Sequence, residues 1–215
     1  MLSELDEKVS LVVLAKELTA AKTRLGLGPG GAEQVALRLV ERTVRAALQA
    51  ECSGAVWVVT SDPLIALQST ELGARIAPEG RPCGMNRAGA MGRDLALRHR
   101  PLGPVAVLVA DLPLLRSDDL DAAAMQFRQV GVPMYVPDHN MIGTTLLIHG
   151  PESRLGLAFG PNSALMHRRL GYRPAARAPR GLRVDLDTPE DAKDFLIGNP
   201  EMENLARLTG PTRCA

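Results

Sequence analysis

The sequence predicts a single α/β domain built on a mostly parallel, doubly wound sheet with helices on both faces. Two observations support this prediction: β-favouring runs alternate with segments of helical period, and the run 104–110 is apolar throughout, as in the centre of a parallel sheet. The length of 215 residues fits one domain. We expect the domain at 1–197 and a tail at 198–215, where Gly, Pro and polar residues follow no period.

Strand and helix signals alternate from the N-terminus onward. Residues 9–14 form a continuous β-favouring run, and a Gly-rich break at 26–31 separates them from a helical period at 32–50. The next run, 55–60, ends before Pro63, and proline is favoured in the first turn of a helix. Further predicted elements are a short strand at 75–77, a helix at 88–98 and the central strand at 104–110.

The second half of the chain continues this alternation. A helix is expected from about residue 118 to 130, where Ser117 and Asp118 can cap it. The remaining predicted elements are strands at 132–136 and 144–149, a helix at 162–170, a strand at 182–186 and a helix at 189–196. In such a fold ligands bind beyond the carboxyl ends of the strands, so the site should lie in the loops that follow them.

Composition argues against several classes of protein. A net charge of +1, from 25 Lys and Arg against 24 Asp and Glu, together with 3% aromatic residues, argues against binding a nucleic-acid polymer. The apolar runs are strand-sized, so no membrane span is expected, and the acidic N-terminus without a leader pattern predicts a cytoplasmic location. Cys52, Cys83 and Cys214 have no paired spacing, which predicts free thiols.

The loop after the first strand carries three cations, Lys16, Lys22 and Arg24. A doubly wound sheet presents its ligand at this edge, so a polyphosphate is the natural counter-ion. A solvated basic loop without a ligand is the alternative interpretation. The loop has neither the Walker P-loop pattern nor the G-x-G-x-x-G pattern.

Three carboxylates are predicted to come at strand ends. Asp111 follows the central strand, while Asp185 and Asp187 lie two apart in a predicted strand and should point to the same side. Paired carboxylates on one face repel each other unless a cation lies between them, which favours a divalent metal. Capping of the following turn or helix is the alternative, although Thr188 and Pro189 already provide a helix start.

Small and hydroxyl residues form a third candidate group. Gly160 and Ser163 lie in the segment 159–163, which precedes a predicted helix whose N-terminal N–H groups favour a phosphate or carboxylate. Thr144 belongs to another segment of this kind. The alternative is ordinary Gly-Pro punctuation with Asn162 or Ser163 as the helix cap.

These segments are more specific as an ordered set than one by one. They are Leu14-Ala15-Lys16, Ala21-Lys22-Thr23-Arg24-Leu25, Met85-Asn86-Arg87-Ala88, Ala110-Asp111-Leu112-Pro113, Gly143-Thr144, Phe159-Gly160-Pro161-Asn162-Ser163 with His167, and Asp185-Leu186-Asp187-Thr188-Pro189-Glu190-Asp191. The set resembles the CofC family of guanylyltransferases over nearly the whole chain. The resemblance implies a Rossmann-like, GT-A-like nucleotidyltransferase fold and transfer of GMP from GTP to the phosphate of a small acid, with release of pyrophosphate, in coenzyme F-420 biosynthesis.

The resemblance also implies a role for each candidate residue. Lys16, Lys22 and Arg24 would hold the triphosphate of GTP, Lys22 acting in catalysis as well, and Thr60 and Asn86 would lie near the guanosine. Asp111, Asp185 and Asp187 would bind catalytic magnesium, and Thr144, Gly160 and Ser163 would hold the acceptor acid. A hand-off of the product to the next enzyme of the pathway is a further expectation.

The acceptor is expected to be phosphoenolpyruvate, as in the actinobacterial branch of the family; 2-phospho-L-lactate and 3-phosphoglycerate stay open, because small pocket differences decide among them. Its phosphate is already anionic at neutral pH, so the reaction needs no general base. That agrees with the lack of a Ser/His/Asp or Cys/His arrangement, and His167 fits a packed histidine better than a catalyst.

Two other functions fit parts of the pattern. A molybdenum-cofactor or sugar-phosphate nucleotidyltransferase of the same fold would have a Gly-rich first loop before its Lys, whereas this chain has Leu14-Ala15-Lys16. A nucleotide-binding regulator without turnover would be expected to lack one of the metal carboxylates, and all three are present here.

Overall fold

The structure is a computed structural model that describes residues 8–18 and 30–186. Its seven-stranded sheet has the order β3-β2-β1-β4-β6-β5-β7. The strands are β1 (Val9–Leu14), β2 (Ser53–Thr60), β3 (Arg75–Pro78), β4 (Val105–Val109), β5 (Met134–Pro137), β6 (Thr144–His149) and β7 (Arg173–Pro174). Only β6 runs antiparallel to its neighbours, β4 and β5, among the described strand pairs. The predicted mostly parallel sheet is therefore confirmed.

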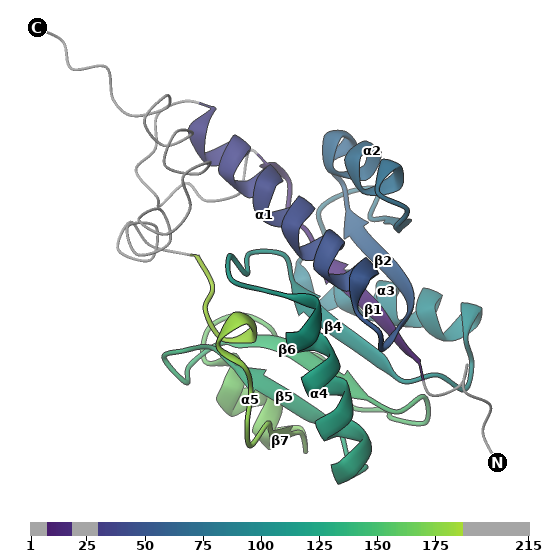
Figure 1. The fold of residues 1–215 in the computed structure, drawn as a ribbon, viewed down its shortest axis with the longest axis vertical. Coiled ribbons are helices and arrows are strands. Elements are labelled where there is room, and N and C mark those ends of the chain that lie inside the picture. Colours follow the sequence, from purple (N-terminus) through teal and green to yellow (C-terminus); the bar gives the residue numbers. More distant parts are fainter. Residues whose placement is uncertain (1–7, 19–29, 187–215) are drawn as a thin grey trace, which may run out of the picture.

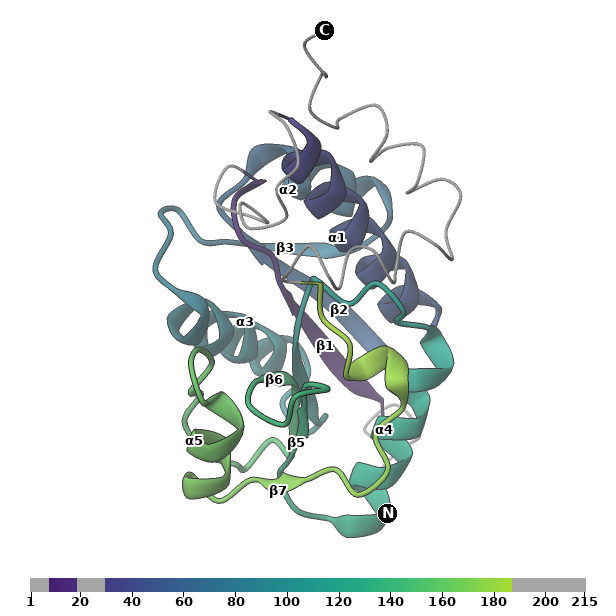
Figure 2. The ribbon, with the colours of Figure 1, turned by 90° about the vertical axis from the view of Figure 1, so that its left-hand side faces the viewer.

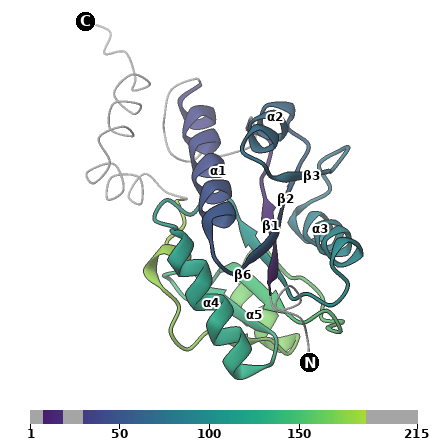
Figure 3. The same ribbon diagram turned by 45° about the vertical axis from the view of Figure 1, so that its right-hand side comes forward.

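Helices cover both faces of the sheet, as predicted (Figures 1 and 2). They are α1 (Gly31–Gln49), α2 (Pro63–Glu71), α3 (Met85–His99), α4 (Ser117–Val130) and α5 (Ser163–Arg169), with a 3-10 turn, η3, at Arg180–Leu182. Helices α1, α2 and α4 lie against one face, and α3 and α5 lie against the other. Figure 3 shows α1 and α3 on opposite sides of β1 and β2.

The alternation of side chains along β1 explains why both faces need a helix. Leu11 and Val13 point to one face and belong to the same buried cluster as Val40 of α1. Val12 and Leu14 point to the other face, where their cluster includes α3. All four residues are at most 6% exposed, so β1 lies in the centre of the core. A strand buried on both faces is continuously apolar, as the sequence of β1 is.

Two helix starts show how local sequence fixes the loops around the site. Asp62 caps α2, since its Oδ1 accepts the N–H groups of Leu64 and Ile65 at 2.9 and 3.1 Å, and Pro63 is the first helical residue as predicted. At α4 the predicted caps, Ser117 and Asp118, are wrong. Asp119 instead accepts the backbone N–H of Arg116 at 2.9 Å, because a carboxylate at the third helical position can reach back to the cap.

The strand predicted at 182–186 is also wrong. The chain makes the η3 turn there and then extends without pairing to any described strand. Hydrogen bonds of another kind fix this segment: Thr145 Oγ1 donates to the Leu182 carbonyl, and the Leu186 N–H donates to the Asp111 carbonyl at 3.1 Å. The segment thus crosses the carboxyl ends of the strands. The predicted helix at 189–196 and tail at 198–215 lie outside the described residues.

Two further sequence predictions concern membrane-spanning segments and free cysteines. Among the helices of the described residues, none is both long and apolar enough to cross a membrane. Cys52 and Cys83 are free, as predicted, and Cys214 lies outside the described residues. Burial raises the pKa of the Cys52 thiol to about 12, so this thiol stays protonated and unreactive.

Candidate active site

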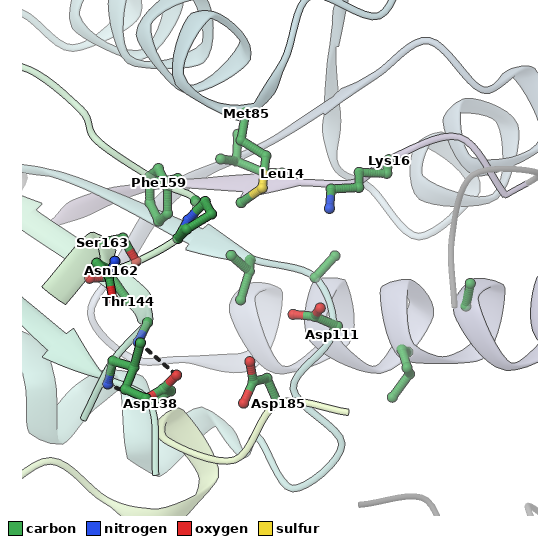
Figure 4. A pocket seen from close by; sticks show the side chains of 18 of the residues that line it. Leu14, Lys16, Met85, Asp111, Asp138, Thr144, Phe159, Asn162, Ser163 and Asp185 are labelled. Carbon is green, nitrogen blue, oxygen red and sulfur yellow. Dashed lines mark hydrogen bonds between the residues drawn. The ribbon is translucent and has the colours of Figure 1, made fainter. Parts of the chain in front are cut away.

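A cavity of about 580 Å³ opens at the carboxyl ends of β1 and β4. This is the edge at which a doubly wound sheet binds its ligands. Figure 4 shows side chains from several separate loops pointing into the cavity. It brings together six of the predicted site residues: Lys16, Asp111, Thr144, Gly160, Ser163 and Asp185. The sequence prediction that these loops form one site is consistent with this arrangement.

Asp111 is anchored through the backbone on either side of it. The carbonyl of Ala110 accepts a hydrogen bond from the buried hydroxyl of Thr43 on α1, at 3.1 Å. The carbonyl of Asp111 itself accepts the Leu186 N–H. This second bond brings Asp185, the neighbour of Leu186, to the same wall of the cavity as Asp111 (Figure 4). The two carboxylates thus meet although they are far apart in the sequence.

Asp185 reaches the cavity by a different route from the one predicted. It does not lie in a strand, so strand alternation does not decide where its side chain points. Its Oδ1 lies 3.6 Å from Nδ1 of His139, and the neighbouring Arg183 donates to the Asp138 carbonyl at 3.2 Å. Asp187, the predicted third carboxylate, lies outside the described residues.

The Asp111 and Asp185 carboxylates form a donor set of the kind that holds magnesium. Mg²⁺ commonly takes one or two carboxylates from a protein and completes its octahedron with substrate phosphates and water. Within 8–18 and 30–186, no group of three or more His, Cys, Asp or Glu residues is arranged to hold a metal by itself. The described residues therefore fit a magnesium ion that is shared with a phosphate substrate.

Lys16 is exposed and lies on the opposite wall from the carboxylates. In Figure 4 its amino group points into the space that Asp111 also faces. The space between this cation and the two carboxylates can hold an anion. Lysine would neutralise such an anion from one side, and a metal held by the carboxylates would do so from the other. The two other predicted cations of this loop, Lys22 and Arg24, lie outside the described residues.

The two residues predicted to lie near the guanosine both make hydrogen bonds to the protein itself. Thr60 is buried, and its hydroxyl accepts the Asp62 N–H at 3.1 Å. Asn86 pairs with the backbone of Phe159, accepting its N–H at 2.6 Å and donating to its carbonyl at 3.1 Å. Their nucleotide contact stays a prediction. Asn86 holds the start of the 159–163 segment, a role that the sequence analysis missed.

Thr144 forms a buried hydrogen bond with His167, 2.9 Å between Oγ1 and Nδ1. The other ring nitrogen, Nε2, accepts the Ala158 N–H at 2.9 Å, so the ring proton must be on Nδ1 and is donated to Thr144. The hydroxyl hydrogen of Thr144 is then available to a ligand. Burial lowers the pKa of His167 to about 4, which keeps the ring neutral at physiological pH.

Asp138 is a cavity residue that the sequence analysis missed. Its carboxylate accepts the N–H groups of Ile142 and Gly143, at 2.9 and 2.7 Å, and so shapes the turn before β6. A Cβ at Gly143 would lie 2.5 Å from Asp138 Oδ2, which explains the glycine. An Asp at the end of a strand with a Gly five residues later was the available signal.

The 159–163 segment also has its shape fixed by the backbone. Gly160 has φ +124°, a conformation that disfavours side chains. Ser163 is 2% exposed and lines the cavity. Asn162 is the N-cap residue of α5, as the alternative interpretation expects, but no side chain makes a capping hydrogen bond there. The N–H of Ala164 donates instead to the Ile142 carbonyl, at 3.0 Å, and joins the two loops.

A second, smaller cavity of about 200 Å³ adjoins the first. Leu14, Lys16 and Met85 line both cavities, so the two are neighbours. Its other walls include Glu17 and Glu79. Lys16 is thus one of three residues at the junction of the two cavities.

Comparison with known proteins identifies the family. No protein-family model matches the chain. A phosphoenolpyruvate guanylyltransferase of Thermomonospora curvata is 40% identical over 192 residues, which are 87% of this chain and 82% of that protein. A phosphoenolpyruvate guanylyltransferase of Streptomyces scabiei is 40% identical over 215 residues, covering 94% and 98% of the two chains. The chain belongs to this guanylyltransferase family, the CofC family. The resemblance seen in the sequence is thereby confirmed, and the chain is a transferase enzyme.

Solved structures of lower identity confirm the fold of this CofC family member. A CMP:2-keto-3-deoxy-manno-octonic acid synthetase complexed with CTP is 14% identical, with a TM-score of 0.56 over 90% of this chain and 99% of that chain. A cytidylyltransferase of Leptospira borgpetersenii is 13% identical, with a TM-score of 0.53 over 97% and 99%. The fold class predicted from the sequence agrees with both structures.

Proposed function

We propose that the protein transfers GMP from GTP to the phosphate of phosphoenolpyruvate and releases pyrophosphate. The observation that carries this proposal is the cavity that brings Lys16 and the carboxylates Asp111 and Asp185 together with a small pocket of hydroxyl and glycine residues. The names of the relatives from Thermomonospora and Streptomyces support the choice of phosphoenolpyruvate. In this role the protein would act in the cytoplasm, in coenzyme F-420 biosynthesis, and would pass its product to the next enzyme.

The chemical step needs orientation and charge neutralisation more than proton transfer. An oxygen of the acceptor phosphate attacks the α-phosphorus of GTP and forms a new P–O bond. The bond from the α-phosphorus to the bridging oxygen breaks, and pyrophosphate leaves with the electron pair. The attacking oxygen carries no proton at neutral pH, so no residue has to remove one. The neutral His167, whose ring nitrogens are both engaged, agrees with a site that lacks a general base.

Magnesium fits the carboxylates of this cavity. Asp111 and Asp185 would hold the ion, and we propose Asp187 as a third ligand. When bound, the ion supplies positive charge that offsets the repulsion between the two anionic substrates and the charge on the leaving pyrophosphate. Lys16 contributes positive charge from the opposite wall, and we propose that Lys22 and Arg24 add to it.

The acceptor pocket supplies neutral hydrogen-bond donors for a small acid that carries two anionic groups, a carboxylate and a phosphate. Thr144 has its hydroxyl hydrogen available because His167 donates to its oxygen. Ser163 contributes a second hydroxyl from the buried start of α5. Gly160 leaves the pocket open, since no atom lies within 4 Å of the place where its Cβ would be. These three residues are proposed to orient the acid so that its phosphate faces the α-phosphorus.

The test is a direct assay of acceptor use. The purified protein is incubated with magnesium, GTP and one of phosphoenolpyruvate, 2-phospho-L-lactate or 3-phosphoglycerate, and pyrophosphate release is measured with the next pathway enzyme present to trap a labile product. We expect the highest rate with phosphoenolpyruvate and no release after chelation of the metal. A higher rate with another acid would overturn the acceptor, and no release with any acid would overturn the proposed function.

A further inference from the structure

The smaller cavity differs in chemistry from the cavity beside it. Apolar side chains, Leu14, Val59 and Ala88 among them, form most of its surface. Two carboxylates, Glu17 and Glu79, also line it. The cavity shares Lys16 with the larger one and is lined by none of the acceptor residues Thr144, Gly160 and Ser163. It is therefore a candidate site for the part of a nucleotide that lies beyond the phosphates. Apolar walls with a few fixed polar groups are typical of a ligand site for a flat ring.

Glu79 is held in place by the backbone. It follows β3 directly, and its own N–H donates to the Thr60 carbonyl at 3.1 Å. Its Oε1 accepts the Cys83 N–H at 2.6 Å, which fixes the direction of the carboxylate. The Cys83 thiol is also hydrogen-bonded to this carboxylate. A carboxylate offers about four lone-pair positions, so the two bonds leave further acceptor capacity on it. A carboxylate can only accept, and it therefore selects a ring that presents donors.

Guanine and adenine differ at the edge that such a group would meet. Guanine presents two donors side by side, its N1–H and its 2-amino group, which match the two oxygens of a carboxylate. Adenine presents the lone pair of N1 beside its 6-amino group, so one carboxylate oxygen would face another acceptor. Against apolar walls such a mismatch is costly, because the facing acceptors lose the hydrogen bonds to water that the bound base displaces.

Glu17 is the less suitable of the two carboxylates for this task. Its Oε1 accepts the hydroxyl of Ser61 at 3.0 Å. It also follows Lys16 directly in the chain, and Lys16 belongs to the junction with the larger cavity. Glu17 is thus the chain neighbour of the residue that would meet the phosphates, whereas Glu79 is separated from it in the chain and lines the smaller cavity but not the larger one. Glu79 also borders a neighbouring surface pocket that includes Arg81 and Arg87.

We propose that the smaller cavity binds the guanine ring and that Glu79 is its specificity-determining residue, accepting from N1–H and the 2-amino group. This inference rests on the proposed function, in which GTP is the donor nucleotide. In this proposal one side chain, Glu79, discriminates between GTP and ATP, and it contacts neither the phosphates nor the acceptor.

The experiment compares GTP, ITP and ATP as donors with phosphoenolpyruvate as the acceptor. ITP keeps the N1–H of guanine and lacks the 2-amino group. The variants are Glu79→Gln, Glu79→Asp and Glu17→Gln, with Lys16→Ala as the matched phosphate control, and circular dichroism checks their folding. The measured quantity is the ratio of kcat/KM between donors, since a variant that is partly unfolded lowers all three values alike.

For the unaltered protein we expect GTP to be used best, ITP less well and ATP least. Glu79→Gln should lower the GTP to ATP ratio at least about tenfold, because its amide presents a donor where adenine has an acceptor. Glu79→Asp should keep the order of the three donors. Lys16→Ala and Glu17→Gln should lower kcat/KM for all three donors by similar factors, because phosphates and ribose are common to them.

Three outcomes would overturn the inference. They are equal use of ITP and GTP by the unaltered protein, an unchanged GTP to ATP ratio in folded Glu79→Gln, and a changed ratio in Glu17→Gln. The first needs no variant, so the inference can be tested even if Glu79→Gln does not fold. Failure of the proposed function looks different: no donor would then release pyrophosphate with any acceptor.

Discussion

The Nδ1 atom of His167 lies 2.9 Å from the hydroxyl oxygen of Thr144, and both side chains are buried. The histidine donates, because its other nitrogen accepts the Ala158 N–H. Thr144 must then donate its own hydrogen elsewhere, and Thr144 lines the cavity proposed to bind the acceptor acid. His167 is thus a positioning residue that acts through Thr144 and through the segment before Phe159.

Thr144→Val should raise the KM for phosphoenolpyruvate about tenfold or more and leave the KM for GTP almost unchanged. The substitution keeps the side-chain volume and removes a hydroxyl that is proposed to donate to a charged ligand, a bond worth about 1.5–3 kcal/mol. Thr144→Ser is the matched control and should retain most of the affinity. Equal KM values for the acid in all three proteins would contradict the proposed contact.

The neutral state of His167 predicts a loss of stability in acid. Its pKa is lowered to about 4 in the folded protein, from about 6.5 when unfolded. The unfolded chain therefore binds a proton first as the pH falls, and the stabilisation present above pH 6.5 is lost progressively down to about pH 4. The free energy of unfolding is measured from pH 7 to pH 4 in the unaltered protein and in His167→Gln. The curve of the variant should be flatter; parallel curves would rule the assignment out.

Asp111→Asn and Asp185→Asn should each lower kcat at least about a hundredfold while the protein stays folded. Each removes a negative charge proposed to bind magnesium and keeps the size of the side chain. Asp187→Asn is expected to behave in the same way. Steady-state kinetics at several magnesium concentrations, with circular dichroism as the folding control, tests this prediction. Near-normal turnover in all three variants would remove the metal assignment.

Asp138→Asn should lower stability more than it lowers turnover, in contrast to Asp111→Asn. The Asp138 carboxylate accepts two backbone N–H groups, and an amide at this position would turn its NH₂ toward one of them. Loss of a hydrogen bond to a buried charged group typically costs about 1.5–3 kcal/mol. Thermal unfolding and kcat are measured on both variants. An unaltered melting temperature in Asp138→Asn would show that the turn before β6 does not depend on these bonds.

Ser163→Ala should raise the KM for phosphoenolpyruvate without lowering the melting temperature. Its side chain makes no capping hydrogen bond to α5, so the helix loses no cap. Gly160→Val should weaken acid binding further, because φ +124° is strained for a β-branched residue and the new methyl groups would enter the pocket. A lower melting temperature in Ser163→Ala with an unchanged KM for the acid would assign Ser163 to stability alone.

The sequence by itself determined the sheet and the edge at which the site lies. Continuous apolar runs such as those of β1 and β4 are typical of parallel strands that are buried on both faces, and the residues after such strands meet at the carboxyl edge of the sheet. Lys16 and Asp111 each come two residues after the end of β1 and β4, so their place at this edge follows from local pattern alone. The ordered motifs add the family, which the relatives confirm.

Only the tertiary structure decided how the other site residues reach that edge. Asp185 comes to Asp111 through a backbone hydrogen bond from Leu186 rather than through a strand. Asn86 pairs with Phe159, 73 residues away, and the neutral state of His167 depends on its burial. Hydrogen bonds between distant residues and the loss of solvent around a ring leave no local period in a sequence. Such hydrogen bonds and such burial form only when distant segments pack together in the folded chain, so they can be seen only in the tertiary structure.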